Sequence, residues 1–322
     1  MTYTSNNIAL AADYNNFVGA NNNLTPYVSA IDATNKIAAL YGVGFGNRGY
    51  GQTSTTIGPV SAATLMTAID WNTLRTVMST LNNHTASSLV LQPVVAIGSL
   101  KIAEDGSSPA TVNLSPLISS LDANRLGAPI GSMTLSFPTY SLIDTNITSW
   151  LNAIQMTTRV TFSNENAARY FFNSNGQIRI VMSHGNSTPG INADWQDIFN
   201  NKLATFSFGA NASSRTGTSG SPQAIGYYQL SGAFQVIFDG TNIGGGIYTG
   251  NDFYIDAKSV SYSGINGGNG LGIDFRIRMI NQSGSDATDN NTTASFGELK
   301  ATSYLTGIQS PSIATLNVWS GS

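Results

Sequence analysis

The residues that could do chemistry in this chain are few and scattered. Its 322 residues include no cysteine and two histidines, His84 and His184. Without cysteine the chain has no disulfide, no thiolate metal site and no cysteine nucleophile. Ser183 precedes His184, but no G-x-S-x-G motif surrounds it, so a nucleophile elbow is not predicted. Because neither histidine has a partner at metal-ligand spacing, we expect both to be surface or helix-capping residues.

One glycine motif has the spacing of a dinucleotide site. Gly44, Gly46 and Gly49 form a G-x-G-x-x-G sequence, which binds a pyrophosphate when a strand precedes it and a helix follows it. Here a helix-like stretch precedes the motif, and the polar segment 52–59 follows it. We therefore expect a glycine-rich loop that packs closely or adopts positive φ, with no cofactor bound.

Two segments resemble calcium loops in composition. Residues 267–274 read GGNGLGID once, with the aspartate out of place for a repeating calcium nonapeptide. Asp286, Asp289 and Asn290 are a second candidate for oxygen ligands. We expect hairpin tips at both, and no metal. The spacing of the 17 acidic residues singles out no pair for glycoside hydrolysis, so we nominate no catalytic residue.

The amino-acid composition limits which classes of protein this chain can belong to. Hydrophobic residues make up 41% of the chain, which is enough for a substantial core, while charged residues make up only 10%, against about 25% in ordinary soluble proteins. Asparagine and glycine, 33 of each, are abundant. Such a surface suits an assembly or an extracellular protein. The net charge of −3 without a basic cluster argues against direct nucleic-acid binding.

No apolar run approaches the ~20 residues of a membrane span, so membrane insertion is not expected. The first ten residues are polar and uncharged, which is unlike a secretory signal.

The elements that must position these residues begin with a helical region, 1–88. Asp70 is a predicted N-cap for a helix whose apolar face carries Trp71, Leu74, Met78 and Leu81, and which ends at 82–84. Another apolar stripe contains Ile31, Ile37, Leu40 and Tyr41 and stops at Gly42.

A short pattern of acid, aromatic, amide, any residue and apolar residue recurs at 13–17, 70–74 and 194–198. The pattern indicates helix starts whose aromatic and apolar residues, three apart, dock on one neighbour. The first two copies both follow alanine-rich segments and indicate a duplication. For the third copy, an ordinary helix start is an equally good explanation.

Residues 89–150 form a mixed connecting region. Segment 89–97 is strand-like but contains Pro93, 112–126 has helical spacing, and 133–137 is a short strand candidate.

From residue 151 to 322 the apolar period changes to two. The clearest alternation is Ile273, Phe275, Ile277 and Met279 against Asp274, Arg276 and Arg278. Similar alternations occur at 159–162, 178–182, 206–208, 234–238 and 253–258, although Ile237 breaks the fourth. Short helices are expected near 164–170 and 194–202. Together these patterns predict an α+β protein: a small helical N-terminal region followed by a mainly antiparallel, β-sandwich-like domain.

Several segments resemble virion structural proteins of tailed phages, especially marine phages and cyanophages. Residues 41–52 (YGVGFGNRGYGQ) and the helix from Asp70 to His84 resemble the N-terminal part of those proteins. Residues 168–179 (ARYFFNSNGQIR) resemble their FFN-x-GG-x-IR segment, with Asn175 where the pattern usually has glycine. Trp195 and the segments 206–209, 225–228 and 275–278 fit the same block. The resemblance covers about 1–88 and 155–280 and implies a particle component without catalytic residues.

From the resemblance and the composition we expect a non-enzymatic building block of the tail, neck or baseplate, located in the virion and assembled in the host cytoplasm. Its expected partners are other virion proteins and copies of itself. A host-binding tail fibre or adhesin that contacts surface glycans is the alternative, which exposed Tyr227, Tyr228 and Tyr248 would favour. A tail depolymerase is a third hypothesis.

Overall fold

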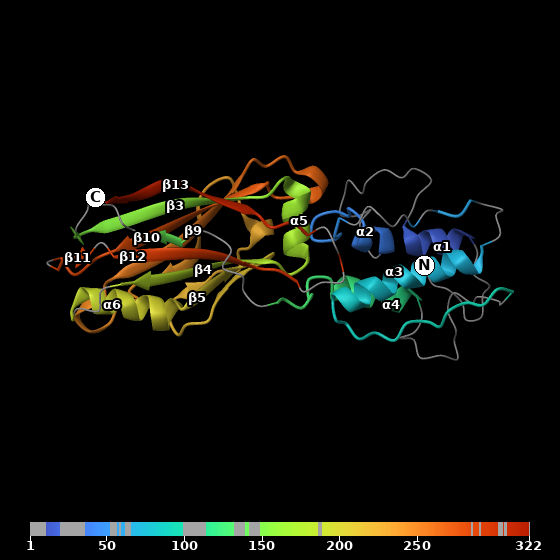
Figure 1. Ribbon diagram of the computed structural model, residues 1–322, viewed down its shortest axis with the longest axis horizontal. Coiled ribbons are helices and arrows are strands. Elements are labelled where there is room, and N and C mark those ends of the chain that lie inside the picture. The colour runs from blue at the N-terminus through green and yellow to red at the C-terminus, as the bar shows by residue number, and fades with distance from the viewer. Residues whose placement is uncertain are drawn as a thin grey trace.

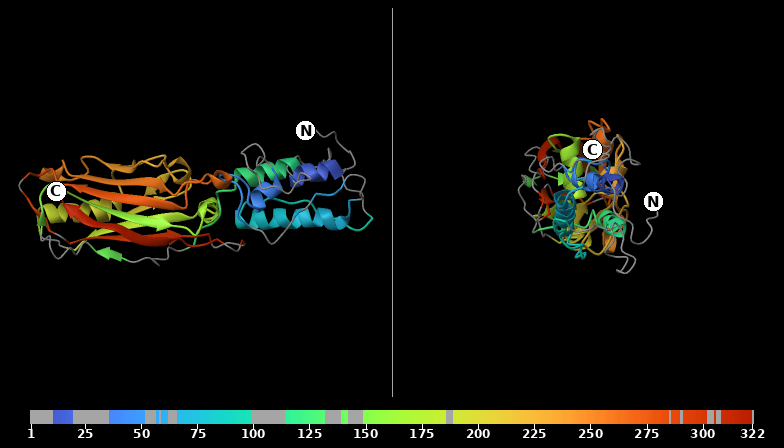
Figure 2. Two further views of the ribbon diagram at one scale, coloured as in Figure 1. Left: turned by 90° about the horizontal axis from the view of Figure 1, so that it is seen from above. Right: turned by 90° about the vertical axis from the view of Figure 1, so that its right-hand side faces the viewer.

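The computed structural model describes residues 11–19, 36–51, 57, 59–61, 66–98, 114–131, 139–141, 149–185, 189–284, 286–289, 291–301, 305 and 308–321. Within them a helical module precedes a domain of antiparallel sheets, which confirms the predicted α+β class. The two parts lie end to end in an elongated body (Figures 1 and 2). No helix among these residues has the length and apolar character needed to cross a membrane.

The helical module packs four helices around their apolar faces. Their bounds are α1 Ala11–Val18, α2 Ile37–Tyr41, α3 Ala68–His84 and α4 Leu114–Ala123. The shared core contains Phe17, Leu40, Leu74, Leu81 and Leu117, each at most 4% exposed. The predicted stripes on α2 and α3 therefore face one core, whereas Ile31 lies outside the described residues.

The start of α3 differs from the prediction. Thr67, not Asp70, is the N-cap, and Asp70 is the third helical residue of a capping box. The Thr67 hydroxyl accepts from the Asp70 amide, and the Asp70 carboxylate accepts from the Thr67 amide at 2.8 Å. Both residue types cap helices well, and the reciprocal pair satisfies two otherwise unpaired amides.

The second domain is a sandwich of two antiparallel sheets. One sheet has the order β1-β12-β4-β5-β6 and the other β13-β3-β10-β9-β8-β7, beside a small β11-β2 pair. The strands are β1 Thr139–Ser141, β2 Ser149–Trp150, β3 Ala153–Thr161, β4 Gln177–His184, β5 Thr205–Phe208, β6 Ser213–Arg215, β7 Ser221–Pro222, β8 Gln235–Gly240, β9 Asp252–Val260, β10 Gly272–Ile280, β11 Thr288–Asp289, β12 Thr292–Leu299 and β13 Ser312–Gly321.

Aromatic residues join the two sheets of the sandwich. The rings of Phe208 and Phe275 lie 5.3 Å apart between centroids, and those of Phe275 and Phe296 lie 6.2 Å apart. The alternating residues at 206–208 and at 273–279, which predicted strands, thus lie on the two inner faces of one core. At Ile237, where the alternation breaks, β8 shifts its register against β9, so the break marks a β-bulge.

The outward face of the larger sheet carries most of the charged side chains of β9 and β10. Asp256 is 1% exposed and accepts from Arg276 at 2.7 Å and Arg278 at 2.7 Å. In the next row Asp274 accepts from Arg159 at 2.6 Å. The antiparallel register places these opposite charges directly across from each other, which holds the three central strands together.

The β domain also contains α5 Glu165–Asn173, α6 Ile191–Asp197 and the π-helical turn η2 Ile198–Leu203, besides the short 3-10 turns η3 Tyr227–Gln229, η4 Gly246–Tyr248 and η5 Ile265–Gly267. The first three cover two regions of the domain. They match the two short helices expected near 164–170 and 194–202. α5 lies across the end of the sandwich that faces the helical module (Figure 1), while its Phe171 and Phe172 are fully buried in the β core. This helix therefore belongs to one domain and touches the other.

The region 89–150 divides between the two domains. Its helix α4 packs in the helical core, β1 and β2 pair in the β domain, and the segment 133–137 lies outside the described residues. The segment 89–97 is not a strand of either sheet. Later in the chain Leu305, between β12 and β13, is buried in the helical core, so the chain crosses between the domains more than once.

Candidate functional site: the joint between the two domains

The loop 42–51 lies between the two domains and carries a dense set of polar contacts. Gly42 ends α2, and its carbonyl accepts from the amides of Tyr50 at 3.0 Å and Gly51 at 3.1 Å, which closes the loop on itself. Gly49 has φ +99, and a Cβ there would lie 2.3 Å from the Val43 carbonyl oxygen. The glycines of the G-x-G-x-x-G motif thus serve a tight loop, as expected, and the described residues that follow them directly, Tyr50 and Gly51, are not helical.

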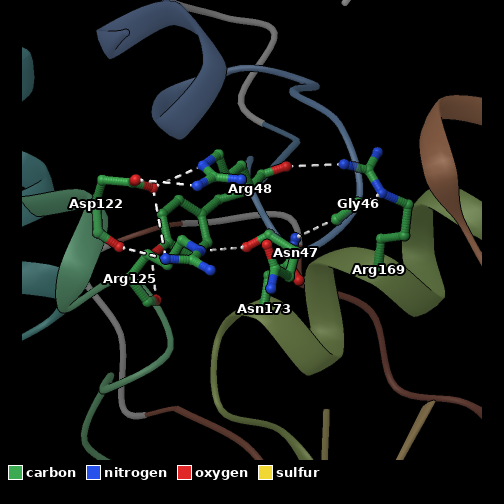
Figure 3. Close-up of polar contacts among 8 residues, drawn as sticks. Gly46, Asn47, Arg48, Asp122, Arg125, Arg169 and Asn173 are labelled. Atoms are coloured by element: carbon green, nitrogen blue, oxygen red, sulfur yellow. Dashed lines mark hydrogen bonds and ion pairs between the residues drawn. The ribbon is translucent and has the colours of Figure 1, made fainter. Parts of the chain in front are cut away.

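Arg169 of α5 anchors this loop to the β domain. Its side chain is fully buried, and its guanidinium donates to the carbonyls of Gly46 at 3.0 Å, Val43 at 3.1 Å and Arg48 at 2.8 Å. Figure 3 shows Arg169 beside Gly46 and Arg48. A fourth bond reaches Asn166 within α5. A planar guanidinium with five donors suits such a set of converging carbonyls. The loop backbone therefore solvates a buried cation.

The Gly46 carbonyl is the point where most of these contacts converge. Besides Arg169 it accepts from Tyr228 at 2.8 Å and from Asn173 at 3.2 Å, while Asn173 also donates to the Gly49 carbonyl at 2.8 Å. The Gly46 amide donates to the Asn266 carbonyl at 2.7 Å. Arg169 and Asn173 are four residues apart on one face of α5, so a single helix face grips the loop.

On the other side the loop is tied to α4. Arg48 pairs with Asp122 in a bidentate bond, at 2.8 and 3.1 Å, and Arg125 donates to the Asn47 carbonyl at 3.0 Å (Figure 3). The Tyr50 hydroxyl donates to the Arg125 carbonyl. Desolvation raises the pKa of the Tyr50 hydroxyl, which keeps it a neutral donor. The loop is thus bonded to both domains at once.

Close packing leaves little room for the joint to move. A Cβ on Gly51, which has φ +70, would lie 1.9 Å from Tyr170 Cε2 on α5. Asn175, which replaces the usual glycine of the FFN-x-GG-x-IR pattern, has φ +60 and donates to the Ala128 carbonyl at 2.9 Å. Asparagine tolerates this left-handed backbone better than most residues, so the departure keeps the turn and adds a contact across the joint.

A second bond set holds the β side of the joint in place. Glu165, at the start of α5, is 4% exposed and accepts from the amides of Ser263 at 2.5 Å and Ile265 at 2.8 Å. These amides belong to the loop that presents the Asn266 carbonyl to Gly46. The carboxylate therefore acts as a structural acceptor, and the whole arrangement can couple two domains mechanically.

The two histidines differ from the prediction of surface or capping residues. His84 is fully buried beside Tyr50, with ring centroids 4.7 Å apart, and within the described part of the chain neither ring nitrogen has a hydrogen-bond partner. Burial lowers its pKa to about 4, so it is neutral and is not a cation at the helix end. His184 is 3% exposed and bonds Thr292 at 3.0 Å and Asn192 at 3.2 Å. The prediction failed because sequence alone does not show which helix end is covered.

The three tyrosines that would mark a glycan-binding surface are engaged within the molecule. Tyr227 is fully buried, with its ring stacked on Phe172 at 4.7 Å. Tyr228 bonds Gly46 and Asn173 in the joint, and Tyr248 donates to Asp286 at 2.7 Å. Desolvation raises the pKa of Tyr227 and of Tyr228.

The calcium candidates have structural roles in the β domain. Asp286 accepts from Tyr248, and Asp289 accepts from Asn192 at 3.0 Å, whereas Asn290 lies outside the described residues. Asn269, in the segment 267–274, bonds the carbonyls of Tyr227 and Leu230. Across the described part of the chain, no group of three or more His, Asp or Glu residues could hold a metal ion.

The duplicated helix motif has a structural counterpart. The rings of Tyr14 and Trp71 meet edge to face at 5.5 Å, so the two copies pack on each other. Asn15 donates to and accepts from the backbone of Val60, both at 2.8 Å. Asn72 does the same for Val95, at 3.0 and 2.9 Å. Each asparagine replaces a strand partner for one extended residue.

The third copy of the motif does not share this role. Trp195 is fully buried in the β core and donates to Thr288 at 3.1 Å, while Asp194 accepts from Asn251 at 3.0 Å. Burial raises the pKa of the Asp194 carboxyl. The copy at 194–198 is therefore built into a different environment from the first two.

Sequence reasoning missed Arg169 as the central residue of the joint. The available signal was the i, i+4 spacing of Arg169 and Asn173 on a helix that also carries Phe171 and Phe172, because buried polar groups on a helix next to a core must find partners. Comparisons with protein-family models, with curated proteins and with solved structures found no match.

Proposed function

We propose that this chain is a non-enzymatic structural component of a tailed-phage virion, in the tail, neck or baseplate, which works by assembling with other virion proteins and with copies of itself. The observation that carries the proposal is the joint. Arg169, Asn173 and Tyr228 hold one loop of the helical module by its carbonyls. A particle component must keep its parts at fixed distances, and a joint of this kind does so.

The use of charge in the molecule supports the same proposal. The chain has few charged residues, and many of those it has are bonded internally. Asp122 pairs with Arg48, Asp256 with Arg276 and Asp274 with Arg159. Charged residues make up only 10% of the chain, and polar uncharged groups cost less free energy to remove from water than ions do when neighbours cover them.

Purified particles test the proposal directly. Tailed particles released from the host of this phage would be banded in a density gradient, washed in high salt and quantified by mass spectrometry against a labelled standard of this chain. We expect a fixed copy number per particle that survives the wash. A protein that stays in the soluble lysate, or whose copy number varies between preparations, would contradict the proposal.

A host-binding module is the second candidate, and one observation favours it. The end of the β domain away from the joint presents Ile247, 83% exposed, and Leu151, 51% exposed. Both side chains are accessible to another molecule. Sedimentation of the full chain with host-cell envelopes tests this candidate: Ile247→Asp should abolish co-sedimentation, whereas Val236→Asp on the sheet face should not. Equal binding by both variants would contradict it.

A further inference from the structure

A group of four cations lies on the outward face of the larger sheet. In the antiparallel register, Arg159 of β3 and Lys258 of β9 stand on either side of Asp274 in β10. Arg276 and Arg278 occupy the next two outward positions of β10. Neighbouring strands lie about 5 Å apart and alternate residues of one strand about 7 Å apart, so the four cations fall within an area of about 10 by 14 Å. We call these four residues the cation patch.

Two buried aspartates hold the arginines of the patch in place. Asp256 accepts from Nε of Arg276 at 2.7 Å and from Nε and Nη2 of Arg278 at 2.7 and 2.9 Å. Asp274 accepts from Nε and Nη2 of Arg159 at 2.6 and 3.0 Å. Among the described residues, the remaining guanidinium nitrogens, which are Nη1 of all three arginines and Nη2 of Arg276, have no hydrogen-bond partner. These nitrogens can donate to an acceptor outside the molecule.

Two aromatic rings pack against the same cations. The centroid of the Phe234 ring lies 4.3 Å from Arg276 Cζ and 4.7 Å from Lys258 Nζ. The centroid of the Tyr254 ring lies 4.5 Å from Arg278 Cζ. These cation–π contacts and the bonds to the aspartates fix the side chains before any ligand arrives, so little side-chain entropy is lost when a ligand binds.

The exposed charge of this face is positive, although the chain as a whole is acidic. The side chains of the four cations are 26–36% exposed, whereas those of Asp256 and Asp274 are at most 3% exposed. Four cations against two carboxylates leave an excess of two positive charges, on a chain whose net charge is −3. One more carboxylate, that of Asp239, lies at the border of the patch, on β8 opposite Tyr254. The patch therefore favours an anionic ligand.

Uncharged polar side chains beside the patch indicate which kind of anion fits. Gln155 of β3 pairs with Arg278 in the register, and Thr157 pairs with Arg276. Neither side chain has a hydrogen-bond partner among the described residues. Guanidinium groups bind carboxylates through two parallel bonds, and amide and hydroxyl groups exchange hydrogen bonds with hydroxyls. A ligand that carries carboxylates and hydroxyls together matches both kinds of side chain.

Other polyanions match the patch less well. Single-stranded nucleic acids stack their bases on open aromatic rings, and both rings of this face are already stacked with cations. Affinity for a duplex rises with the number of phosphates that cations neutralise, and an excess of two charges supplies few such contacts. An acidic polypeptide offers carboxylates without the hydroxyls that adjoin each carboxylate of an acidic sugar.

We propose that the cation patch binds an acidic polysaccharide. Carboxylates of its uronic acid units pair with the outer nitrogens of the three arginines and with Lys258, and hydroxyls of the same units meet Gln155 and Thr157. Charge pairs at partly exposed positions are individually weak, so several sugar units bind together along the sheet. This site is separate from the exposed apolar residues Ile247 and Leu151, and it does not depend on the proposed place of the chain in a particle.

Titration of the full chain with polygalacturonate, a polymer of a uronic acid, tests the proposal, with neutral dextran as the comparison. We expect saturable binding of polygalacturonate at about 50 mM NaCl that weakens at least about tenfold at about 200 mM, because salt screens the charge pairs. Dextran should not bind. No binding of polygalacturonate, or equal binding of dextran, would overturn the proposal.

Two double variants with the same change of net charge locate the site. Gln155→Glu with Thr157→Glu places two carboxylates opposite arginines of the patch and removes no contact of the buried aspartates, so its thermal unfolding should match that of the parent. It should bind polygalacturonate about tenfold more weakly. Ser183→Glu with Thr205→Glu, on the outward face of the smaller sheet, should keep the dissociation constant within about twofold of the parent. Equal weakening in both double variants would contradict a site on the larger sheet.

Parallel titrations with three other polyanions distinguish the class of ligand. Poly-L-glutamate, duplex DNA and phosphatidylcholine–phosphatidylglycerol vesicles carry negative charge without uronic acid. Polygalacturonate should bind most tightly at equal concentrations of negative charge. Binding of any of the three that is as tight or tighter would assign the patch to acidic polypeptides, nucleic acid or lipid and overturn the proposal. All titrations use the isolated protein, so their outcome is separate from whether the chain is found in virions.

Discussion

Acid should weaken the helical module through one buried residue, His84. This side chain is fully buried, neither ring nitrogen has a hydrogen-bond partner among the residues that the structure describes, and burial lowers its pKa from 6.5 to about 4. In the unfolded chain the imidazole is solvated and takes up a proton near its ordinary pKa. The unfolded state therefore binds the proton first as the pH falls. The free energy of unfolding is therefore highest well above pH 6.5. It declines as the pH falls from about 6.5 to about 4, and below 4 this group lowers it no further.

The size of the effect follows from the two pKa values. For each proton that the unfolded chain binds and the folded chain does not, the free energy of unfolding falls by about 1.36 kcal/mol per pH unit. Between pH 7.5 and pH 5 the free energy of unfolding of the module therefore falls by about 2 kcal/mol. With a urea dependence of about 2 kcal/mol per molar, the unfolding midpoint falls by about 1 M. His84→Leu removes the titrating group and its unpaired nitrogens. This variant should be as stable as the parent at pH 7.5 or more stable, since a buried unsatisfied polar group costs about 1–3 kcal/mol.

Urea unfolding followed by circular dichroism at 222 nm, at pH 7.5 and pH 5, measures the difference. The loss of stability on acidification should be about 2 kcal/mol larger for the parent than for His84→Leu. His184→Asn is the matched control, because that histidine also has a lowered pKa but lies in the β domain, hydrogen-bonded to Thr292 and Asn192. Equal acid sensitivity of the parent and His84→Leu would refute the reasoning.

Four further changes test other parts of the structure. Arg169→Met leaves the carbonyls of Val43 and Arg48 unpaired and should lower the free energy of unfolding by about 3 kcal/mol. Small-angle X-ray scattering of this variant should also show a wider spread of interdomain distances. A scattering curve unchanged from that of the parent would count against the rigid joint. Gly51→Ala should lower the free energy of unfolding by about 2–4 kcal/mol, measured by thermal unfolding, because its Cβ would meet Tyr170. Gly46→Ala has φ +57 and open space around its Cβ, so it should cost only about 1 kcal/mol. Similar values for both variants would contradict the close approach of Gly51 to Tyr170. Asp256→Asn leaves Arg276 and Arg278 without their carboxylate and should lower the free energy of unfolding by about 2–3 kcal/mol. Asp197→Asn, at an exposed ion pair with Lys202, should lower it by less than about 1 kcal/mol. Denaturant titration of both variants measures the two values. Asn72→Leu releases the backbone of Val95 and should speed hydrogen exchange in the peptide 89–97, with no change in the β domain.

The class of each domain could be predicted from the sequence because it depends on local periodicity. Ile273, Phe275, Ile277 and Met279 alternate with charged residues, and a strand with one covered face produces that alternation whatever its neighbours are. Trp71, Leu74, Met78 and Leu81 predict a helix for the same reason. Even the irregularity at Ile237 was visible as a break in the period, and it coincides with the bulge of β8.

The joint, in contrast, depends on contacts between residues far apart in the chain. Arg169 meets Gly46 and Arg48 across more than 120 positions, and no local pattern records such a meeting. The asparagine bonds to Val60 and Val95 and the burial of His84 beside Tyr50 are of the same kind. Composition and spacing determined which segments are helices, strands and tight loops, because those depend on near neighbours. Only the tertiary structure decided which polar groups lose water and which partners replace it, since desolvation is a property of the packed molecule.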